Sequence, residues 1–149
     1  MTCRWVTIQR NVDDNFHRRW VEFENGFGNN TEGQSYWAGL KTMHEMTKDH
    51  PLKMKFTLGS EIIIYDSFQV HDATSNYTLH ISGFNKDESN DENGLDPYEL
   101  HKANNEEFST SEEGEFNYIP FYFGGGWHGK SNLSQLNKKQ GSEISLLIE

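Results

Sequence analysis

The groups in this chain that could perform chemistry are seven histidines and a single cysteine, and they follow no catalytic pattern. The sequence has no HExxH zinc motif, no GxSxG nucleophile turn and no cysteine–histidine signature. Because Cys3 is alone, it can form neither an internal disulfide nor a cysteine-based zinc site. We therefore predict a non-enzymatic chain without a metal site.

A cluster of aromatic residues and glycines in the last third of the chain is better suited to binding. Residues 116–123 (FNYIPFYF) are followed by GGGWHG at 124–129. Aromatic rings form the rigid apolar walls of recognition pockets, and glycines let the backbone approach a ligand. The alternative is that these rings fill a loop-rich core. The glycine triplet is no phosphate loop, because no Lys-Ser/Thr pair follows it.

An acidic, turn-rich tract at residues 85–96 (NKDESNDENGLD) is the other candidate. Ser89, Asp91, Asn93 and Gly94 match the first part of a helix-loop-helix calcium loop. The twelfth position of that loop is Leu100, where the motif requires a bidentate Glu. We therefore interpret the tract as a solvated loop with at most weak, adventitious cation binding.

Length and charge limit the classes of protein to which the chain can belong. Its 149 residues fit one ordinary domain. A formal net charge of −10 argues against nucleic acid as a partner, because Lys and Arg must neutralise the phosphates. No apolar run approaches the ~18 residues of a membrane span, and the start shows no signal-peptide pattern. The 13 glycines and 13% aromatic residues favour a loop-rich fold over a helical bundle.

Two short helices are predicted in the first third of the chain. Trp20 and Phe23 share one face of a helix that the following glycines end, within an aromatic scaffold at residues 18–40. Apolar spacing predicts a second helix at residues 40–47, with His44 half-buried.

Alternating residues predict strands that surround these helices. The strands are expected at residues 3–9, 52–58, 61–65 and 77–81, and the second and third form a hairpin. Because side chains alternate between the faces of a strand, His80 is expected to face solvent.

Three Asn-x-Ser/Thr sequons begin at Asn29, Asn76 and Asn132. We predict glycosylation at these positions. Chance produces such triplets often, so they give only mild support for secretion.

Several motifs occur in a fixed order: WVTIQR at 5–10, YWAGL at 36–40, NYTLHISGF at 76–84 and FST at 108–110. This series resembles the fibrinogen-related domain, the C-terminal globular module of fibrinogen chains, ficolins, angiopoietins and tenascins. The family's corresponding motifs are WTVIQRR, FWLGL, NYRLHVGGY and FST. The resemblance covers nearly the whole chain and implies an α+β, fibrinogen C-terminal-like fold, mainly a twisted antiparallel sheet with short flanking helices.

The resemblance also implies an internal organisation. Residues 1–149 form one fibrinogen-like domain, in which residues 1–84 supply the central sheet and helices. Residues 85–149 form a shortened, loop-rich recognition subdomain, and residues 142–148 (SEISLLI) could serve as its closing strand.

The chain departs from the family after FST. Family members have an Asp-rich calcium loop and a disulfide there, for which this chain has too few residues and no cysteine, so the calcium site is expected to be lost and no cofactor is expected. In this register Tyr122 and Phe123 take the place of the family's tryptophan pair, and Trp127 and His128 that of its Cys-His pair. A cis Gly126–Trp127 bond, which sugar-binding members have before the cysteine, loses its usual support.

The resemblance implies a secreted, non-catalytic recognition module of the lectin-like, pattern-recognition type found in innate immunity. Its ligand would be a glycan, with acetylated sugars among the candidates, or an extracellular protein. The expected binding residues are Tyr122, Phe123, Trp127 and His128. The alternative is a structural or oligomerising domain whose pocket has decayed. No nucleic-acid or membrane partner is expected, and a homo-oligomer remains open.

Overall fold

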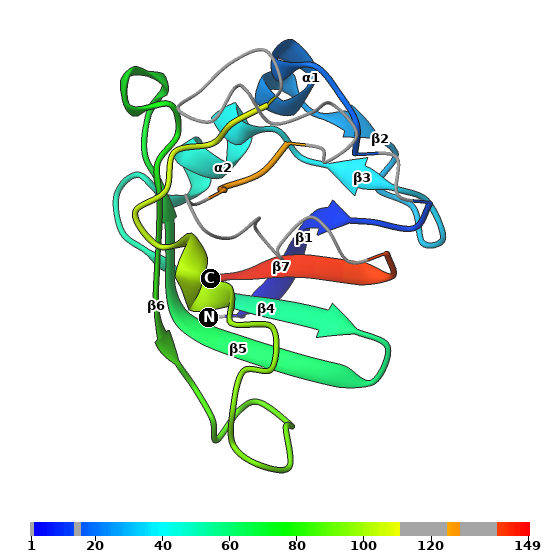
Figure 1. Cartoon of the computed structure of the whole chain (residues 1–149), viewed down its shortest axis with the longest axis vertical. Helices are drawn as coiled ribbons and strands as arrows, with labels where there is room; N and C mark the ends of the chain where they lie inside the picture. Colours follow the sequence, from blue (N-terminus) through cyan, green and yellow to red (C-terminus); the bar gives the residue numbers. More distant parts are fainter. Residues whose placement is uncertain (1, 14–15, 111–124, 129–139) are drawn as a thin grey trace.

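The computed structural model describes residues 2–13, 16–110, 125–128 and 140–149, which build a seven-stranded sheet with helices at one end (Figure 1). The sheet order is β2-β3-β1-β7-β4-β5-β6, and every neighbouring pair is antiparallel. The strands are β1 (Arg4–Arg10), β2 (Phe27–Gly28), β3 (Tyr36–Trp37), β4 (Leu52–Leu58), β5 (Glu61–Val70), β6 (Leu79–Phe84) and β7 (Ser142–Ile148). The helices are α1 (Trp20–Asn25) and α2 (Leu40–Thr47), and the 3-10 turns are η1 (Ala73–Ser75) and η2 (Leu100–Ala103).

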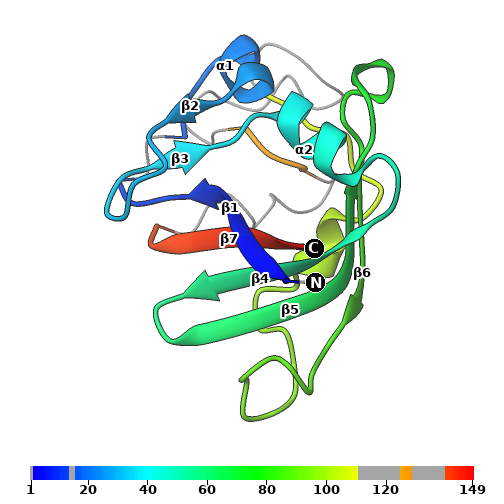
Figure 2. The same cartoon turned by 180° about the vertical axis from the view of Figure 1, so that it is seen from behind.

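The predicted fold class is confirmed, and so are α2 and the β4–β5 hairpin. Helices α1 and α2 lie beside β2 and β3, and in both views the β4–β5 hairpin lies on the far side of β1 and β7 from them (Figures 1 and 2). His44 is half-buried as predicted, and its Nδ1 donates to the Val70 carbonyl at 2.9 Å. Strand β6 begins at Leu79, later than predicted, because Tyr77 has a left-handed backbone with φ 53°.

The C-terminal strand β7 lies in the middle of the sheet. It pairs with β1 on one side and with β4 on the other. The sheet is therefore not confined to residues 1–84, because one of its central strands comes from the last ten residues of the chain. Removing β7 would separate β1, β2 and β3 from the hairpin.

The inner face of the sheet carries the hydrophobic core. Met54 and Phe56 of β4 alternate inward and are fully buried, as are Ile144 and Leu146 of β7. A register shift in β1 between Thr7 and Gln9 explains why two consecutive residues of that strand, Ile8 and Gln9, are both buried.

The predicted aromatic scaffold forms around Trp37. Its Nε1 donates to the Phe23 carbonyl at 2.7 Å, and its ring meets the rings of Phe16 and Phe23 edge-on. Gly39 is required where α1 and α2 meet. It has φ 105°, and a Cβ there would lie 2.8 Å from the backbone of Asn25.

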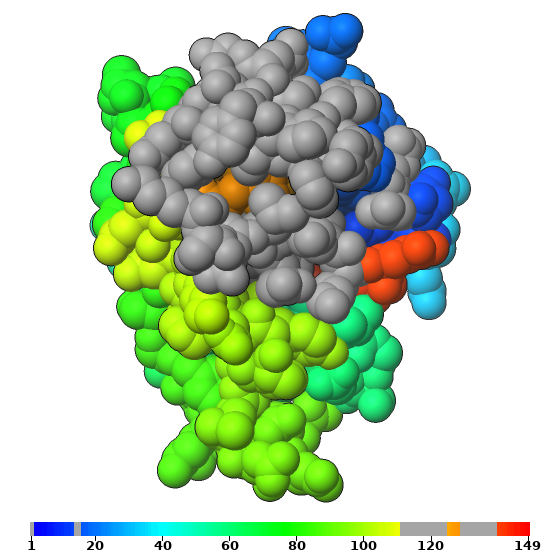
Figure 3. Space-filling view, viewed as in Figure 1, coloured from blue at the N-terminus to red at the C-terminus, as the bar shows by residue number. Residues whose placement is uncertain are grey.

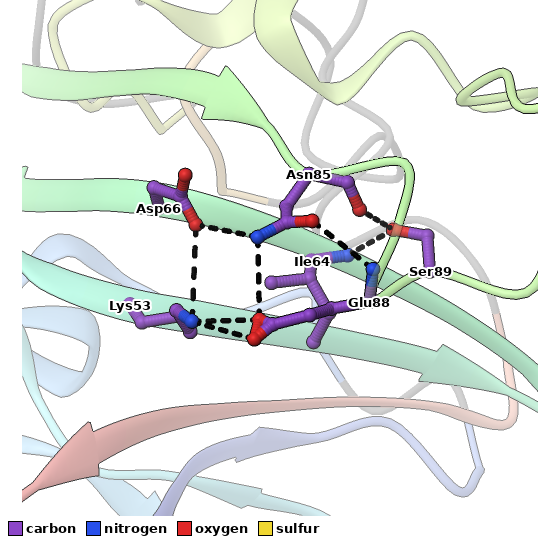
Figure 4. Close-up of polar contacts among 6 residues, drawn as sticks. All are labelled: Lys53, Ile64, Asp66, Asn85, Glu88 and Ser89. Carbon is purple, nitrogen blue, oxygen red and sulfur yellow. Dashed lines mark hydrogen bonds and ion pairs between the residues drawn. The ribbon is translucent and has the colours of Figure 1, made fainter.

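The acidic tract at 85–96 is mostly exposed, as predicted, and it also covers an edge of the sheet. Pairing between β6 and β5 stops at Tyr65, opposite Phe84. Beyond that point Asn85 N–H donates to the Ile64 carbonyl at 2.8 Å. Ser89 Oγ accepts from Ile64 N–H at 2.9 Å (Figure 4). The tract thereby satisfies backbone groups of β5 that would otherwise form an open edge.

Side chains extend this attachment. Asn90 Oδ1 accepts from Ile62 N–H at 2.7 Å, and Asn90 Nδ2 donates to the Ser60 carbonyl at 2.7 Å. Lys53 Nζ lies 2.6 and 2.7 Å from the two carboxylate oxygens of Glu88 (Figure 4). The tract forms the lower end of the molecule in Figure 3.

Candidate functional site

The segment at residues 125–128 is attached to the body of the protein by a short antiparallel bridge. Ser109 N–H donates to the Gly126 carbonyl at 2.9 Å, and Gly126 N–H donates to the Ser109 carbonyl at 3.0 Å. The segment runs beside residues 108–110 (Figure 1), and all of the residues in both segments are buried.

Trp127 fixes the segment to the aromatic core. Its side chain is 1% exposed, and its Nε1 donates to the Tyr77 carbonyl at 2.8 Å. Its ring centre lies 5.0 Å from that of Phe108, 6.0 Å from that of Trp37 and 6.3 Å from that of Phe68. Packing of this kind adds to the free energy gained from burial. Trp127 therefore acts as an anchor.

The two described glycines of the triplet lie closely packed against side chains of the protein. A Cβ on Gly125 would lie 2.5 Å from the Phe23 ring, and one on Gly126 would lie 2.9 Å from the His128 ring. The sequence suggested that these glycines allow a ligand to approach. In the described structure, the groups that approach them are protein side chains.

A turn at Asn76 and Tyr77 joins the parts of this region. Both residues have left-handed backbones, with φ 54° and 53°, which is uncommon outside glycine and costs about 1–3 kcal/mol each. The Asn76 carbonyl accepts from Phe108 N–H at 2.9 Å, and the Tyr77 carbonyl accepts from Trp127. Burial and the hydrogen bond to the Glu24 carboxylate raise the pKa of Tyr77 above its ordinary value.

Two of the four predicted binding residues are among those that the structure describes. Trp127 and His128 are each 1% exposed, and the backbone brings them together over the aromatic core. Tyr122 and Phe123 lie outside the described residues, so the structure does not test their roles. No cis peptide bond occurs in the described part of the chain, which includes Gly126 and Trp127.

The predicted glycosylation sites differ in their surroundings. Asn29 is exposed, and its Oδ1 accepts from Thr31 Oγ1 at 3.0 Å. Asn76 is half-buried, and its Nδ2 donates to Glu107 Oε1 at 2.7 Å. Asn132 lies outside the described residues. Of the two described sites, Asn29 therefore presents its side-chain amide better to solvent.

The described residues contain no group of three or more His, Cys, Asp or Glu side chains that could hold a metal ion. The expected loss of the family's calcium site concerns residues after Thr110, most of which lie outside the description, and it stays a prediction. In the described ranges, no helix has the length and apolar character needed to cross a membrane.

A cavity of about 490 Å³ lies elsewhere, where the end of α2 and the start of β4 meet the end of β7. Its lining combines apolar side chains with charged ones: Met46, Leu52, Ile148, Lys53 and Glu149. None of the four predicted binding residues lines it.

Comparison with solved structures gives the same fold. The fibrinogen-like globe domain of human ANGPTL2 matches with a TM-score of 0.72 at 18% identity, over 97% of this chain and 79% of that one. A lamprey fibrin D-dimer complexed with the peptide Gly-His-Arg-Pro-amide matches with a TM-score of 0.68 at 18% identity, over 96% of this chain and 61% of that one. At these identities the match shows the fold alone.

Sequence comparison gives the family. Bovine (Bos taurus) fibrinogen-like protein 1 is 38% identical over 88 residues, which cover 54% of this chain and 28% of the relative. Tenascin-R of Rattus norvegicus is 29% identical over 147 residues, 92% of this chain and 10% of the relative. The chain thus spans well under a third of either relative. The family model for the C-terminal globular domain of fibrinogen beta and gamma chains matches residues 1–146. Since this match covers nearly the whole chain and the same fold is found, the chain belongs to the fibrinogen C-terminal domain family.

Proposed function

We propose that the chain is an extracellular, non-catalytic recognition module that binds a glycan or a protein through the region around residues 122–128. The observation that carries this proposal is the anchoring of residues 125–128 by Trp127 and the Ser109–Gly126 bridge. In the sequence, Tyr122 and Phe123 stand three and two positions before Gly125, the first residue of this anchor.

The burial of the anchor suggests a division of roles. Trp127 and His128 expose almost no surface, so they serve as positioning residues for the segment. Tyr122 and Phe123 are the proposed contacts, with their rings packing against the apolar face or acetyl methyl of a ligand. Family membership supports recognition in general, and the lamprey fibrin D-dimer in complex with Gly-His-Arg-Pro-amide is an example of peptide binding by this fold.

The test is a thermal melt of the 149-residue chain with N-acetylglucosamine at high millimolar concentration. A ligand that binds only the native state raises the midpoint of unfolding by mass action. We expect the sugar to raise the midpoint of the unmodified chain and to have no effect on the double variant Tyr122→Ala/Phe123→Ala.

The control for this test is Trp5→Ala, which removes a partly exposed tryptophan of β1. With the sugar, this variant should show the same rise in the midpoint of unfolding as the unmodified chain. An equal shift in the double variant would place the sugar site elsewhere. The absence of any shift in the unmodified chain would argue against an acetylated sugar as the ligand.

A structural or oligomerising domain is the second candidate, and the near-complete burial of Trp127 and His128 favours it, because both residues serve the core. Light scattering over a range of protein concentrations separates the two proposals. A mass that rises with concentration, together with no response to sugar, would favour the structural domain.

Secretion and the absence of a cofactor are part of the same proposal. When the chain is expressed through a secretory route, we expect a glycan at Asn29 more readily than at Asn76, whose amide is held by Glu107. We expect no change in the melting midpoint on adding Ca²⁺. An increase with Ca²⁺ would show that a calcium site persists.

A further inference from the structure

Two histidines from neighbouring parts of the sheet lie side by side on the protein surface. His71 directly follows β5 and His80 lies in β6, and their ring centres are 4.4 Å apart with the ring planes inclined at 60°. Both side chains are exposed.

Strand register creates the pair. His80 lies opposite Gln69, and Gln69 and His71 are two residues apart, so the pleat directs both toward the face that His80 occupies. His71 N–H donates to the Thr78 carbonyl at 2.9 Å, which continues the ladder past the end of β5 and fixes the backbone under both rings.

An uncharged imidazole nitrogen is the histidine atom that binds metal ions. Both rings are exposed, so ions in solution can reach them. The adjacent carboxylate, Asp72, accepts a hydrogen bond from Thr74 Oγ1 at 2.6 Å.

The separation of the rings fits two ligands of one ion. A metal–nitrogen bond of about 2.0–2.1 Å places the ion roughly 3.2 Å from the centre of each ring. Two such rings at a ligand angle of 90° have centres about 4.5 Å apart, and at a tetrahedral angle about 5.2 Å apart. The observed 4.4 Å is close to the separation at 90°, the ligand angle of square-planar Cu²⁺ and Ni²⁺ sites, once rotation of the two exposed rings turns a nitrogen of each toward the ion.

We propose that His71 and His80 chelate one divalent transition-metal ion, bound most tightly as Cu²⁺. The described residues add no third side chain to make a larger cluster, so water would complete the coordination. A bound ion would link the start of β6 to the end of β5 across the η1 turn. This proposal is independent of the recognition site at 122–128. It differs from the prediction from sequence, which was a chain without a metal site.

The experiment is a calorimetric titration of CuCl₂ into the full chain after treatment with EDTA. All samples carry Cys3→Ser, because Cys3 is an exposed thiol that would bind and reduce Cu²⁺. We expect one equivalent of Cu²⁺ to bind, and His71→Gln and His80→Gln each to weaken binding by about tenfold or more, since loss of even a second-shell partner often costs that much. NiCl₂ and ZnCl₂ should bind more weakly than CuCl₂.

His50→Gln is the matched control, because His50 is an exposed histidine in the connection between α2 and β4. It should leave the affinity unchanged. In NMR spectra of the seven histidines, the ring protons of His71 and His80 should broaden first on adding Cu²⁺. No saturable binding, equal affinity in the double variant His71→Gln/His80→Gln, or an effect of His50→Gln as large as that of His71→Gln would each overturn the proposal.

Discussion

The segment at 125–128 and the acidic tract at 85–96 are both irregular pieces of chain fixed to the body of the protein, but different forces hold them. Trp127 is inserted into an aromatic core and exposes 1% of its surface. Asn85, Glu88 and Asn90 instead hold the acidic tract through side-chain contacts with Asp66, Lys53 and Ile62 N–H that water can reach. Apolar burial without water is the stronger attachment, because solvent replaces lost polar contacts at the surface.

The largest effect is therefore expected at Trp127. Trp127→Ala should lower the free energy of unfolding by about 3–5 kcal/mol, because it leaves a cavity among Trp37, Phe68 and Phe108. Urea unfolding followed by circular dichroism measures this loss. Trp5→Ala is the control: Trp5 is 37% exposed and its ring lies 4.5 Å from the Lys55 ammonium, so its removal should cost clearly less than that of Trp127. Equal losses in the two variants would contradict the anchoring role of Trp127.

Overpacking beside the same anchor should have the next largest effect. Gly125→Ala places a methyl group 2.5 Å from the Phe23 ring and should destabilise the protein by about 1–3 kcal/mol. The same substitution in a Phe23→Leu background should cost less, because the smaller side chain leaves room for the methyl group. If the penalty is the same in both backgrounds, the strain does not arise at Phe23.

A smaller effect is expected where the acidic tract covers β5. Asn90→Ala removes the side-chain partners of Ile62 N–H and the Ser60 carbonyl and should cost about 1 kcal/mol, since water partly replaces both contacts. Hydrogen exchange at the Ile62 amide should become faster. Asn93→Ala, at another exposed position of the tract, should change neither quantity. Unchanged exchange at Ile62 in Asn90→Ala would show that the tract does not protect this edge.

The smallest effect is expected for the exposed ion pair. Lys53→Met removes the contacts with Glu88 and should change the free energy of unfolding by about 0–1 kcal/mol, with less effect at high salt. Urea unfolding of Lys53→Met, Glu88→Gln and the double variant, each at low and high salt, gives the coupling free energy between the two residues. A coupling as large as the loss in Trp127→Ala would reverse the comparison between the two regions.

Local patterns were sufficient to predict much of the fold. Alternation and a Gly-Ser turn predicted the β4–β5 hairpin, and apolar spacing predicted α2, because these elements depend on residues close together in the sequence. The order of motifs predicted the family. His80 was correctly expected to be exposed, since strand alternation alone determines its face.

Tertiary structure decided what depends on partners far apart in the sequence. Strand β7 pairs with β1, over 130 residues away, and no local pattern distinguishes a central strand from a closing one. The aromatic and glycine pattern at 116–129 fits either a pocket or a core, and only the three-dimensional packing shows that Trp127 and His128 are buried. The pairing of His71 with His80 also requires the register of β5 and β6, because the sequence determines the face of each side chain but not which side chains meet across strands.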